Sequence, residues 1–372
     1  MGPGGESFGG HARVSSRLIP ISGCGAKGPA CFLVNTAHAR LVLDLGYGPQ
    51  PGLWPDVSAI GAVDALLLSH SHRDHAGALK LCSDIGNPQV HASAIVGNLL
   101  GAEIDTSPLP LHGSTEVCGI RVTTGRNGHA PGGVWLHLDV DDGLLYTGDY
   151  SVESPVYAYD APPPARTVIL DASYGDYDAP LADCMDALDD LFDQGPVLLP
   201  VPAAGRAADI ALHVERSGRG LPHIDDDIRA LLKKLAADYR ECLRPEAAAA
   251  LDRIACEAPG IERAEGVMLA GVADALSGRA AARVSQWESA GAPAIVFTGY
   301  VPPGTPAERL TRSKRASYVR WNVHPRLSDN AALVRACGAR VVLPAFADAK
   351  HIWAWRSAFA PAQISFEGPI IL

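Results

Sequence analysis

The feature that most constrains this chain is a dense group of metal-binding side chains directly after an apolar run. Residues 65–68 read Ala-Leu-Leu-Leu, and the next seven positions contain His70, His72, Asp74 and His75. Such an apolar run is typical of a strand covered on both faces of a sheet. Two histidines separated by one residue in extended backbone point to the same side, so the first pair can bind one metal ion while the second pair turns toward another. The pattern therefore predicts a metal site at the end of a buried strand, because these ligands rarely coincide at this spacing in a surface loop.

The charge of the chain limits the partners that it can bind. The 372 residues carry a formal net charge of −10, which excludes a protein that coats nucleic acid with a broad basic face. A polyanionic substrate would need a local basic patch. One basic stretch could supply it, with a solvated loop as the alternative. Its members are Arg309, Arg312, Lys314, Arg315, Arg320 and Arg326.

The cysteines and the N-terminal residues bear on the compartment. The eight cysteines form no CxxC pair and no dense framework, so we expect reduced thiols in a cytoplasmic protein. Residues 1–14 are rich in glycine and polar residues, and we expect them to be flexible. No run approaches the roughly 18 apolar residues that cross a bilayer, so membrane insertion is not expected.

The hydrophobic pattern changes near residue 174, from short strand-like segments to long helical ones. Short strands among the later helices indicate an inserted α/β unit with a small parallel sheet. The apolar face of the longest helical segment is interpreted as core or as a dimer contact. The expected strands are 30–34, 40–45, 119–124, 134–140, 143–147, 197–200, 294–298 and 341–343. The expected helices are 76–82, 181–192, 207–215 and 226–256, and we expect the last to be broken at Pro245.

The His-x-His-x-Asp-His segment resembles the motif of the metallo-β-lactamase superfamily, whose αββα sandwich holds one or two zinc ions at the edge of its sheets. Three further segments fit the same family. Asp44 resembles the early aspartate that supports the histidines. His129 resembles the third histidine of the first metal site, and Asp149 resembles the aspartate that bridges both metals. Each alone could be a turn, loop or capping residue. Their order and intervals after the histidine cluster favour the metal-site interpretation.

The second half resembles one branch of that superfamily, the β-CASP nucleases, which include the RNA 3′-end processing endonuclease, ribonuclease J and the DNA-repair nuclease Artemis. The passages that carry the likeness are 170–175, with Asp171 as the acidic residue, 197–207 and 297–305. The resemblance implies an α/β fold, in which a metallo-β-lactamase αββα sandwich carries an inserted α/β β-CASP-like domain. The expected domains are residues 15–176 for the first part of the sandwich, 177–314 for the insert and 315–372 for the return segment.

Two motifs near the end of the chain depart from the β-CASP pattern. The family has a histidine two residues before an aspartate, but an ungapped fit places Leu327 there, so His324 serves only with a short insertion and is otherwise a surface histidine. RNA-acting members then have a histidine after a buried strand, whereas residues 342–346 read Val-Leu-Pro-Ala-Phe. His351 on the next helix is a tentative substitute, with a helix-surface histidine as the plainer interpretation. DNA-acting members also lack the last histidine, so its absence weakens the case for RNA without excluding activity.

The resemblance implies a metal-dependent phosphodiester hydrolase. We expect an exo- or endonuclease that acts on single-stranded RNA, with DNA as the second choice, through a metal-bound hydroxide. Two zinc ions are the expected cofactors for mixed imidazole and carboxylate ligands, and iron or manganese could use the same set. Asp74, Asp171 and His324 are the expected catalytic residues, for orienting the hydroxide and moving a proton at the leaving oxygen.

Two other classes of protein remain open. The acidic charge and the altered late motifs would suit a small-molecule phosphodiesterase or ester hydrolase of the same fold. A non-catalytic β-CASP-like subunit would suit a chain without metal ligands, but all the predicted ligands are present. They are His70, His72, Asp74, His75, His129 and Asp149. The oligomeric state is left open, with a homodimer as one option.

Overall fold

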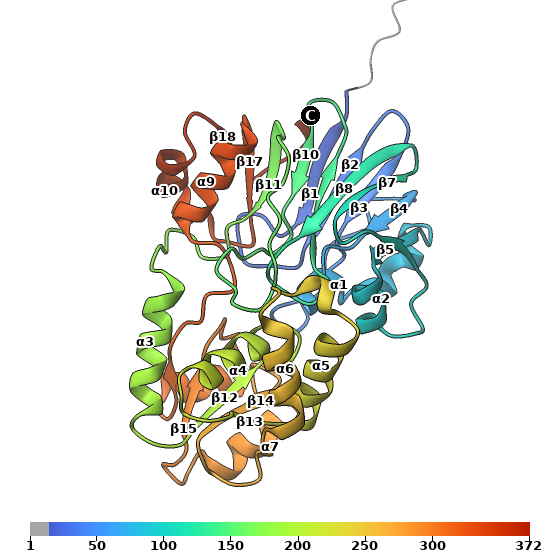
Figure 1. Ribbon diagram of the computed structural model, residues 1–372. Helices are drawn as coiled ribbons and strands as arrows, with labels where there is room; N and C mark the ends of the chain where they lie inside the picture. Colours follow the sequence, from blue (N-terminus) through green and yellow to red (C-terminus); the bar gives the residue numbers. More distant parts are fainter. Residues whose placement is uncertain (1–14) are drawn as a thin grey trace, which may run out of the picture.

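The computed structural model describes residues 15–372, which form three β-sheets and the helices around them (Figure 1). The flexible segment expected at residues 1–14 lies outside the described residues. Two seven-stranded sheets make up one part of the molecule, and a five-stranded sheet with its own helices makes up the other. The predicted α/β class, a sandwich with an inserted α/β unit, is confirmed.

The first sheet contains the strand that leads into the histidine cluster. Its order is β19-β1-β2-β3-β4-β5-β6, with β3 to β6 parallel. The apolar run forms β4, which is completely buried, as its unbroken hydrophobicity predicts. The strands are β1 (Arg17–Ser22), β2 (Cys31–Asn35), β3 (Arg40–Leu43), β4 (Ala65–Leu67), β5 (Gln89–Ser93), β6 (Thr106–Leu109) and β19 (Ile370–Ile371).

The second sheet packs face to face with the first. Its order is β18-β17-β11-β10-β9-β8-β7. Phe32 and Leu43 of the first sheet and Leu136 and Tyr146 of the second belong to one buried cluster, which is the core of the sandwich. The strands are β7 (Gly113–Val117), β8 (Ile120–Arg126), β9 (Val134–Leu138), β10 (Leu144–Tyr146), β11 (Thr167–Asp171), β17 (Val341–Ala345) and β18 (Gln363–Ile364).

Helices cover the outer faces of both sheets and complete the αββα sandwich. The chain leaves the sandwich after β11 and returns as β17, which pairs in parallel with β11 (Figure 1). The third sheet is therefore inserted between two neighbouring strands. The first sheet is covered by α1 (Arg73–Ala76), the 3₁₀ helix η1 (Leu79–Ile85) and α2 (Ala94–Leu100). The second sheet is covered by α9 (Leu327–Cys337) and α10 (Ile352–Ala358), and the 3₁₀ helix η3 (Ala349–His351) precedes α10.

The third sheet is entirely parallel, in the order β13-β14-β12-β15-β16. Side chains alternate along β12, so Leu199 packs with α3 to α6 on one face and Leu198 with α7 and α8 on the other. The strands are β12 (Val197–Val201), β13 (His223–Ile224), β14 (Val267–Gly271), β15 (Ala294–Phe297) and β16 (Ser317–Tyr318). The helices are α3 (Leu181–Phe192), α4 (Arg206–Arg216), α5 (Asp226–Ala237), α6 (Ala247–Glu257), α7 (Gly278–Trp287) and α8 (Pro306–Arg312). Because β16 lies beyond residue 314, the expected end of the insert falls inside this sheet, and the division into domains stays a prediction.

The helical pattern at 226–256 forms two helices, and the break expected at Pro245 is present but begins earlier, after Ala237. α5 ends at Ala237, the 3₁₀ helix η2 (Arg240–Cys242) follows, and α6 begins at Ala247. Leu232 and Leu235 of α5 are buried in the chain's own core, which favours the core interpretation of this apolar face. The helix expected at 76–82 is replaced by η1. β14 was missed, because a short apolar run does not by itself distinguish a strand from a buried helix.

The cysteines agree with the expectation of reduced thiols. All eight lie within the described residues and are free thiols. Burial raises the pKa of Cys337 to about 11, so this thiol stays protonated near neutral pH. Among residues 15–372, none of the helices has the length and apolar character needed to cross a membrane.

Asp209 is a buried carboxyl group in the first turn of α4. Its Oδ1 accepts a hydrogen bond from the Ser154 hydroxyl at 2.8 Å, and its side chain is almost inaccessible to solvent. Burial disfavours the charged form and raises the pKa of Asp209 from 3.8 to about 7. The folded chain therefore binds this proton more tightly than the unfolded chain.

We expect Asp209 to make the free energy of unfolding fall as the pH rises. Because the pKa is higher in the folded state, the stabilisation is fully present below 3.8 and is lost as the pH rises through about 7. Since one pKa unit corresponds to about 1.4 kcal/mol, the loss is at most about 4 kcal/mol. Urea unfolding at several pH values should show this fall in the unchanged chain and in the exposed control Asp252→Asn. An equal fall in Asp209→Asn would contradict the assignment.

Candidate metal centre

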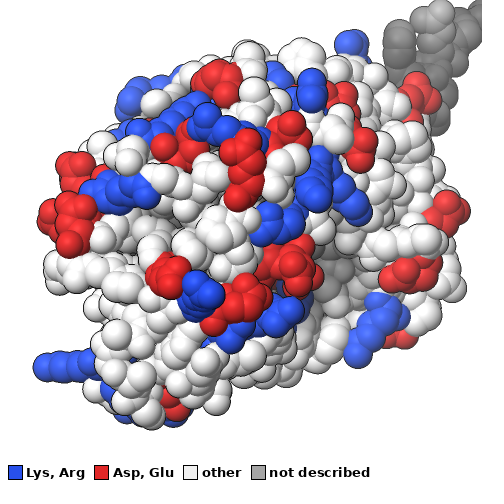
Figure 2. All heavy atoms as spheres, turned by 60° about the horizontal axis from the view of Figure 1, so that its bottom comes forward, with Lys and Arg blue, Asp and Glu red and all other residues white. Residues whose placement is uncertain are grey.

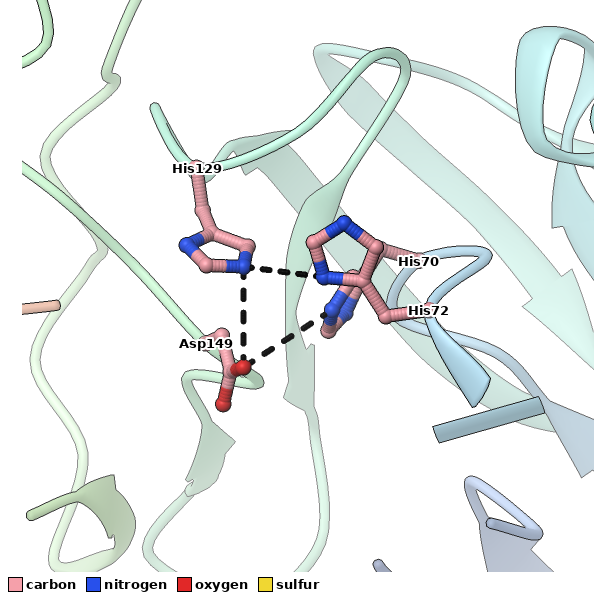
Figure 3. Close-up of side chains that lie close together, drawn as sticks. All are labelled: His70, His72, His129 and Asp149. Atoms are coloured by element: carbon pink, nitrogen blue, oxygen red, sulfur yellow. Dashed lines mark hydrogen bonds and ion pairs between the residues drawn. The ribbon is translucent and has the colours of Figure 1, made fainter. Parts of the chain in front are cut away.

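Four side chains converge at one edge of the sandwich. His70 and His72 follow β4, His129 follows β8 and Asp149 follows β10. They point toward one another (Figure 3), and one donor atom of each lies within 4.8 Å of the other three. His70, His129 and Asp149 are almost fully buried, and His72 is partly exposed. The core of the sandwich therefore positions this group, which we call the first ligand group.

Each imidazole ring of the first ligand group has one nitrogen bound by the protein and the other directed into the group. The bound nitrogens are Nδ1 of His70, Nε2 of His72 and Nδ1 of His129. A metal binds imidazole through an unprotonated nitrogen, so these contacts select the tautomers that leave the inner nitrogens free. The partners are the Ser69 hydroxyl, 3.0 Å from His70, and the carbonyl oxygens of Ala204 and Val323, which accept from His72 and His129 at 2.6 and 2.7 Å.

Burial keeps these histidines neutral. Burial lowers the pKa of His70 and of His129 well below 6.5, with a further contribution from neighbouring imidazoles, and it also lowers the pKa of His72. Burial alone would raise the pKa of Asp149, but the surrounding imidazoles, led by His75, hold it well below 3.8. The group therefore combines neutral imidazoles with an ionised carboxylate.

The donors that face the centre of the group are only partly satisfied by the protein, since His72 Nδ1 and His129 Nε2 contact only each other there, at 3.1 Å. In the part of the chain that the structure describes, His70 Nε2 is buried without a hydrogen bond. Leaving such atoms unpaired in a core is costly unless something else binds them. Three imidazole nitrogens with one carboxylate oxygen form a donor set typical of zinc and of other first-row divalent ions. The residues present therefore fit a divalent metal.

A second ligand group shares Asp149. Donor atoms of Asp74, His75 and Asp149 lie within 4.8 Å of one another, and His75 Nε2 is 3.2 Å from Asp149 Oδ1. Burial alone would lower the pKa of His75, but the carboxylates of Asp149 and Asp44 raise it well above 6.5. A metal ion bound here would have to displace that proton. With three residues instead of four, the second ligand group is the less complete one.

Phe346 lies next to Ala345, near which the family pattern has its last histidine. It follows β17, and its ring centroid is 4.9 Å from that of the His75 imidazole. Its side chain is 2% exposed, so an apolar ring closes this side of the second ligand group. The sequence showed that the family's last histidine is absent. The structure adds that an apolar ring contacts His75 on this side of the second ligand group.

Asp44 connects the second ligand group to the core. Its Oδ1 accepts from the backbone N–H of Ser69 at 2.7 Å, and its Oδ2 accepts from the Ser69 and Tyr146 hydroxyls. The same Oδ2 lies 2.7 Å from His75 Nδ1. The backbone φ of Asp44 is 56°, in the left-handed region, which a short polar side chain tolerates better than most. These contacts agree with the expectation that Asp44 supports the histidines. The sequence did not predict that Ser69 and Tyr146 would contact Asp44.

His324 lies at the centre and faces Asp171, the last residue of β11. Its Nδ1 is 2.9 Å from Asp171 Oδ2 and 3.7 Å from Asp149 Oδ2, and these three residues form a third ligand group. Leu327 instead begins α9 and packs against the outer core of the second sheet. The alignment with a short insertion after His324 is therefore the one that the structure favours over the ungapped fit.

His351 lies away from these groups. Its Nδ1 pairs with Asp176 at 3.0 Å, and its ring packs against Trp355 with a centroid distance of 5.7 Å. Within residues 15–372, it is in none of the three ligand groups. The structure thus favours the helix-surface interpretation over a role as a substitute ligand.

The ligand groups open into a cleft of about 460 Å³ between the sandwich and the third sheet. Tyrosines and cations form much of the remaining wall. In the described chain, none of the cations that line the cleft forms an ion pair with a carboxylate. These cations are Lys27, Arg73, Arg206 and Arg320, and the tyrosines are Tyr174, Tyr300 and Tyr318.

The basic stretch noted in the sequence faces the cleft only in part. Arg320 lines the cleft, where its guanidinium lies over the rings of Tyr174 and Tyr177. Four other members pair with three carboxylates instead. Arg309 and Arg315 pair with Glu288, Arg312 with Glu308, and Arg326 with Asp329. Lys and Arg are interspersed with Asp and Glu over the face in Figure 2, so this stretch does not form the single basic patch that the sequence suggested.

Comparison with known proteins supports what the geometry indicates. The profile of the Metallo-beta-lactamase superfamily matches residues 25–201, which include the first ligand group. The chain carries a metallo-β-lactamase domain. A crystal structure of a protein of unknown function from Enterococcus faecalis aligns with 96% of this chain and 100% of that one, with a TM-score of 0.61 and 15% identity, which shows the shared fold alone.

Curated relatives of this chain belong to one branch of that superfamily. Transcription termination factor FttA of Methanosarcina mazei is 26% identical over 252 residues, which cover 55% of this chain and 40% of that protein. Endoribonuclease YSH1 of Yarrowia lipolytica is 26% identical over 274 residues, 60% of this chain and 33% of that protein. The chain thus spans less than half the length of these relatives. Both belong to the β-CASP branch, so the predicted resemblance is confirmed.

We expect Asp44→Ala to weaken binding of a divalent metal, tested with zinc, about 10- to 100-fold. The reason is that His75 loses the carboxylate that orients its ring, and Ser69 loses the partner that holds it beside His70. Competition with a chromophoric chelator measures the affinity. The exposed Asp84→Ala serves as the matched control and should bind zinc as the unchanged chain does. An unchanged affinity in Asp44→Ala would remove this role.

Proposed function

We propose that this chain is a metal-dependent phosphodiester hydrolase, a nuclease that acts on single-stranded RNA, with DNA as the second choice. The observation that carries the proposal is the position of three ligand groups around the shared Asp149, at the base of a cleft lined by unpaired cations. A phosphodiester is the anionic group that both features suit. The names of the FttA and YSH1 relatives, a transcription termination factor and an endoribonuclease, support RNA as the substrate class.

Two zinc ions are the proposed cofactors, with iron or manganese as alternatives that use the same donors. The proposed ligands are His70, His72, His129 and Asp149 for the first ion, and Asp74, His75 and Asp149 for the second. Divalent ions bound there would acidify water toward neutral pH and neutralise the charge that develops on the phosphate. The unequal number of ligands predicts that the first ion is bound more tightly than the second.

The chain's own residues then have separate tasks. Asp74 lines the cleft beside the second ligand group, where its carboxylate can orient the attacking water. His324 also lines the cleft, and its Nδ1 is held by Asp171 at 2.9 Å. That contact leaves Nε2 of His324 to donate a proton at the leaving oxygen, with Asp171 fixing the ring. Tyr174 accepts the backbone N–H of Val323 at 2.9 Å and so positions the segment that carries His324.

A small-molecule phosphodiester is the second candidate substrate. The observation that favours it is the mixed charge of the surface around the third sheet, which offers a long polyanion no continuous basic path (Figure 2). A non-catalytic role has less support, because the proposed ligands of the first group are all present and converge. The two substrate classes differ in what a hydrolysis assay would show.

The proposal is tested by metal content and hydrolysis together. Elemental analysis of protein purified without chelator should find about two divalent ions per chain, and the protein should cleave single-stranded RNA faster than single-stranded DNA. Product lengths separate exo- from endonucleolytic cleavage. Hydrolysis of bis-p-nitrophenyl phosphate without cleavage of either polymer would favour the small-molecule candidate, and metal-free protein without any hydrolysis would contradict both.

We expect His72→Ala or Asp74→Ala to lower kcat by at least about 10³-fold while the chain stays folded, because each removes a ligand or the group that orients water. The matched control is His351→Ala, which replaces a histidine outside the ligand groups. Hydrolysis rates and circular dichroism check both points. Full activity in either site variant would remove this mechanism, and a comparable loss in His351→Ala would revive its role as a ligand.

We expect Phe346→His to strengthen binding of the second metal ion by about tenfold or more. The new imidazole would lie beside His75, where it can complete the second ligand group. The backbone φ at position 346 is 63°, a value that histidine adopts more readily than phenylalanine. Native mass spectrometry at graded zinc concentrations counts the ions bound. Phe346→Leu, which keeps the contact apolar, should leave the second ion weakly bound; equal occupancy in all three proteins would contradict the prediction.

A further inference from the structure

We propose that Arg206 forms an anion subsite that binds the backbone phosphate next to the scissile one. The inference rests on the proposed function for the class of substrate. Arg206 is the first residue of α4, lines the cleft and is only 7% exposed. A guanidinium at such a position is the group best suited to hold a phosphate by two parallel hydrogen bonds.

The guanidinium of Arg206 is buried without a counter-charge. Its Nη1 donates to the carbonyl oxygen of Thr298 at 2.8 Å, and its Nε has no hydrogen-bond partner. Among residues 15–372, no carboxylate lies within ion-pair distance, and the acid one turn along α4, Asp209, accepts from Ser154 instead. Burying an unpaired cation is costly, and burial lowers the pKa of Arg206 accordingly. A bound anion would supply the missing partner.

The surroundings place this cation beside the first ligand group. Gly205, which precedes α4, is so near His72 that a Cβ built on it would lie 3.6 Å from His72 Nε2. The positive end of the α4 dipole therefore points to the same region as the guanidinium. An anion bound by Arg206 would thus adjoin the metal centre without replacing the group that reacts there.

Arg320 extends the same positive wall. Its guanidinium lies 4.4 and 4.5 Å from the ring centroids of Tyr174 and Tyr177, which hold it over the cleft. By contrast, Arg309 and Arg315 outside the cleft both pair with Glu288. Arg206 and Arg320, which line the cleft, are therefore without an ion pair, whereas Arg309, Arg312, Arg315 and Arg326 of the basic stretch pair with acids. This distribution suits an anion with more than one phosphate, in which the second phosphate contacts Arg206.

The test is the salt dependence of RNA binding. A fluorescent single-stranded RNA of about ten nucleotides is titrated with the full chain in the cold, and its integrity is checked on a gel afterwards. Each phosphate neutralised on a single strand contributes about 0.7 to the slope of log affinity against log salt. Arg206→Met should weaken binding about tenfold and reduce this slope by about 0.7. Arg216→Met, the same change at the exposed other end of α4, should alter neither value.

A second variant keeps the charge and moves it. A Cβ built on Gly299 would overlap the guanidinium of Arg206, so Gly299→Ala should displace that group and weaken binding with no change in net charge. This variant serves if Arg206→Met fails to fold, which thermal unfolding would reveal. The subsite would be overturned if folded Arg206→Met kept the salt slope of the unchanged chain or if Gly299→Ala kept its affinity. An equal effect of Arg216→Met, or failure of the unchanged chain to bind RNA, would also overturn it. RNA binding with these effects but without hydrolysis would retain the subsite and remove the proposed catalytic function.

Discussion

The structure depends on three neutral imidazoles whose inner nitrogens crowd together: His72 Nδ1 lies 3.1 Å from His129 Nε2, and among the described residues His70 Nε2 has no hydrogen-bond partner. In a core of this density, such nitrogens are tolerated only if another group binds them. Their outer nitrogens are bound by Ser69, Ala204 and Val323, and this arrangement sets the tautomers before any ligand arrives. The site is therefore preorganised by hydrogen bonds at its back, while its front is left for a metal ion.

These outer hydrogen bonds join parts of the fold that are far apart in the sequence. Ser69 belongs to the sandwich, whereas Ala204 lies between β12 and α4 of the third sheet, and Val323 lies in the segment that returns to the sandwich. The inserted unit thus contributes to the metal centre itself, besides forming one wall of the cleft. We infer that separating the insert from the sandwich would release the rings of His72 and His129 as well as open the cleft.

The distribution of charge follows the same logic. An acidic protein cannot attract a polyanion over its whole surface, so attraction must be concentrated where reaction occurs. In this chain Arg309, Arg312, Arg315 and Arg326 pair with nearby acids, while Arg206 and Arg320 stay unpaired at the cleft. Burial makes the unpaired cations more effective, because a charge shielded from water interacts more strongly with a bound anion.

The sequence by itself determined the superfamily, the sandwich with its inserted unit, and the convergence of His70, His72, His129 and Asp149, because ligand spacing after apolar strands is a local property. Tertiary structure decided the rest. Only the fold placed His324 instead of Leu327 beside Asp171, set Phe346 against His75, and left Arg206 without a carboxylate. These outcomes depend on which side chains and carbonyl groups meet across sheets and loops. Every residue carries a carbonyl, and an arginine looks the same in the sequence whether or not an acid later packs beside it.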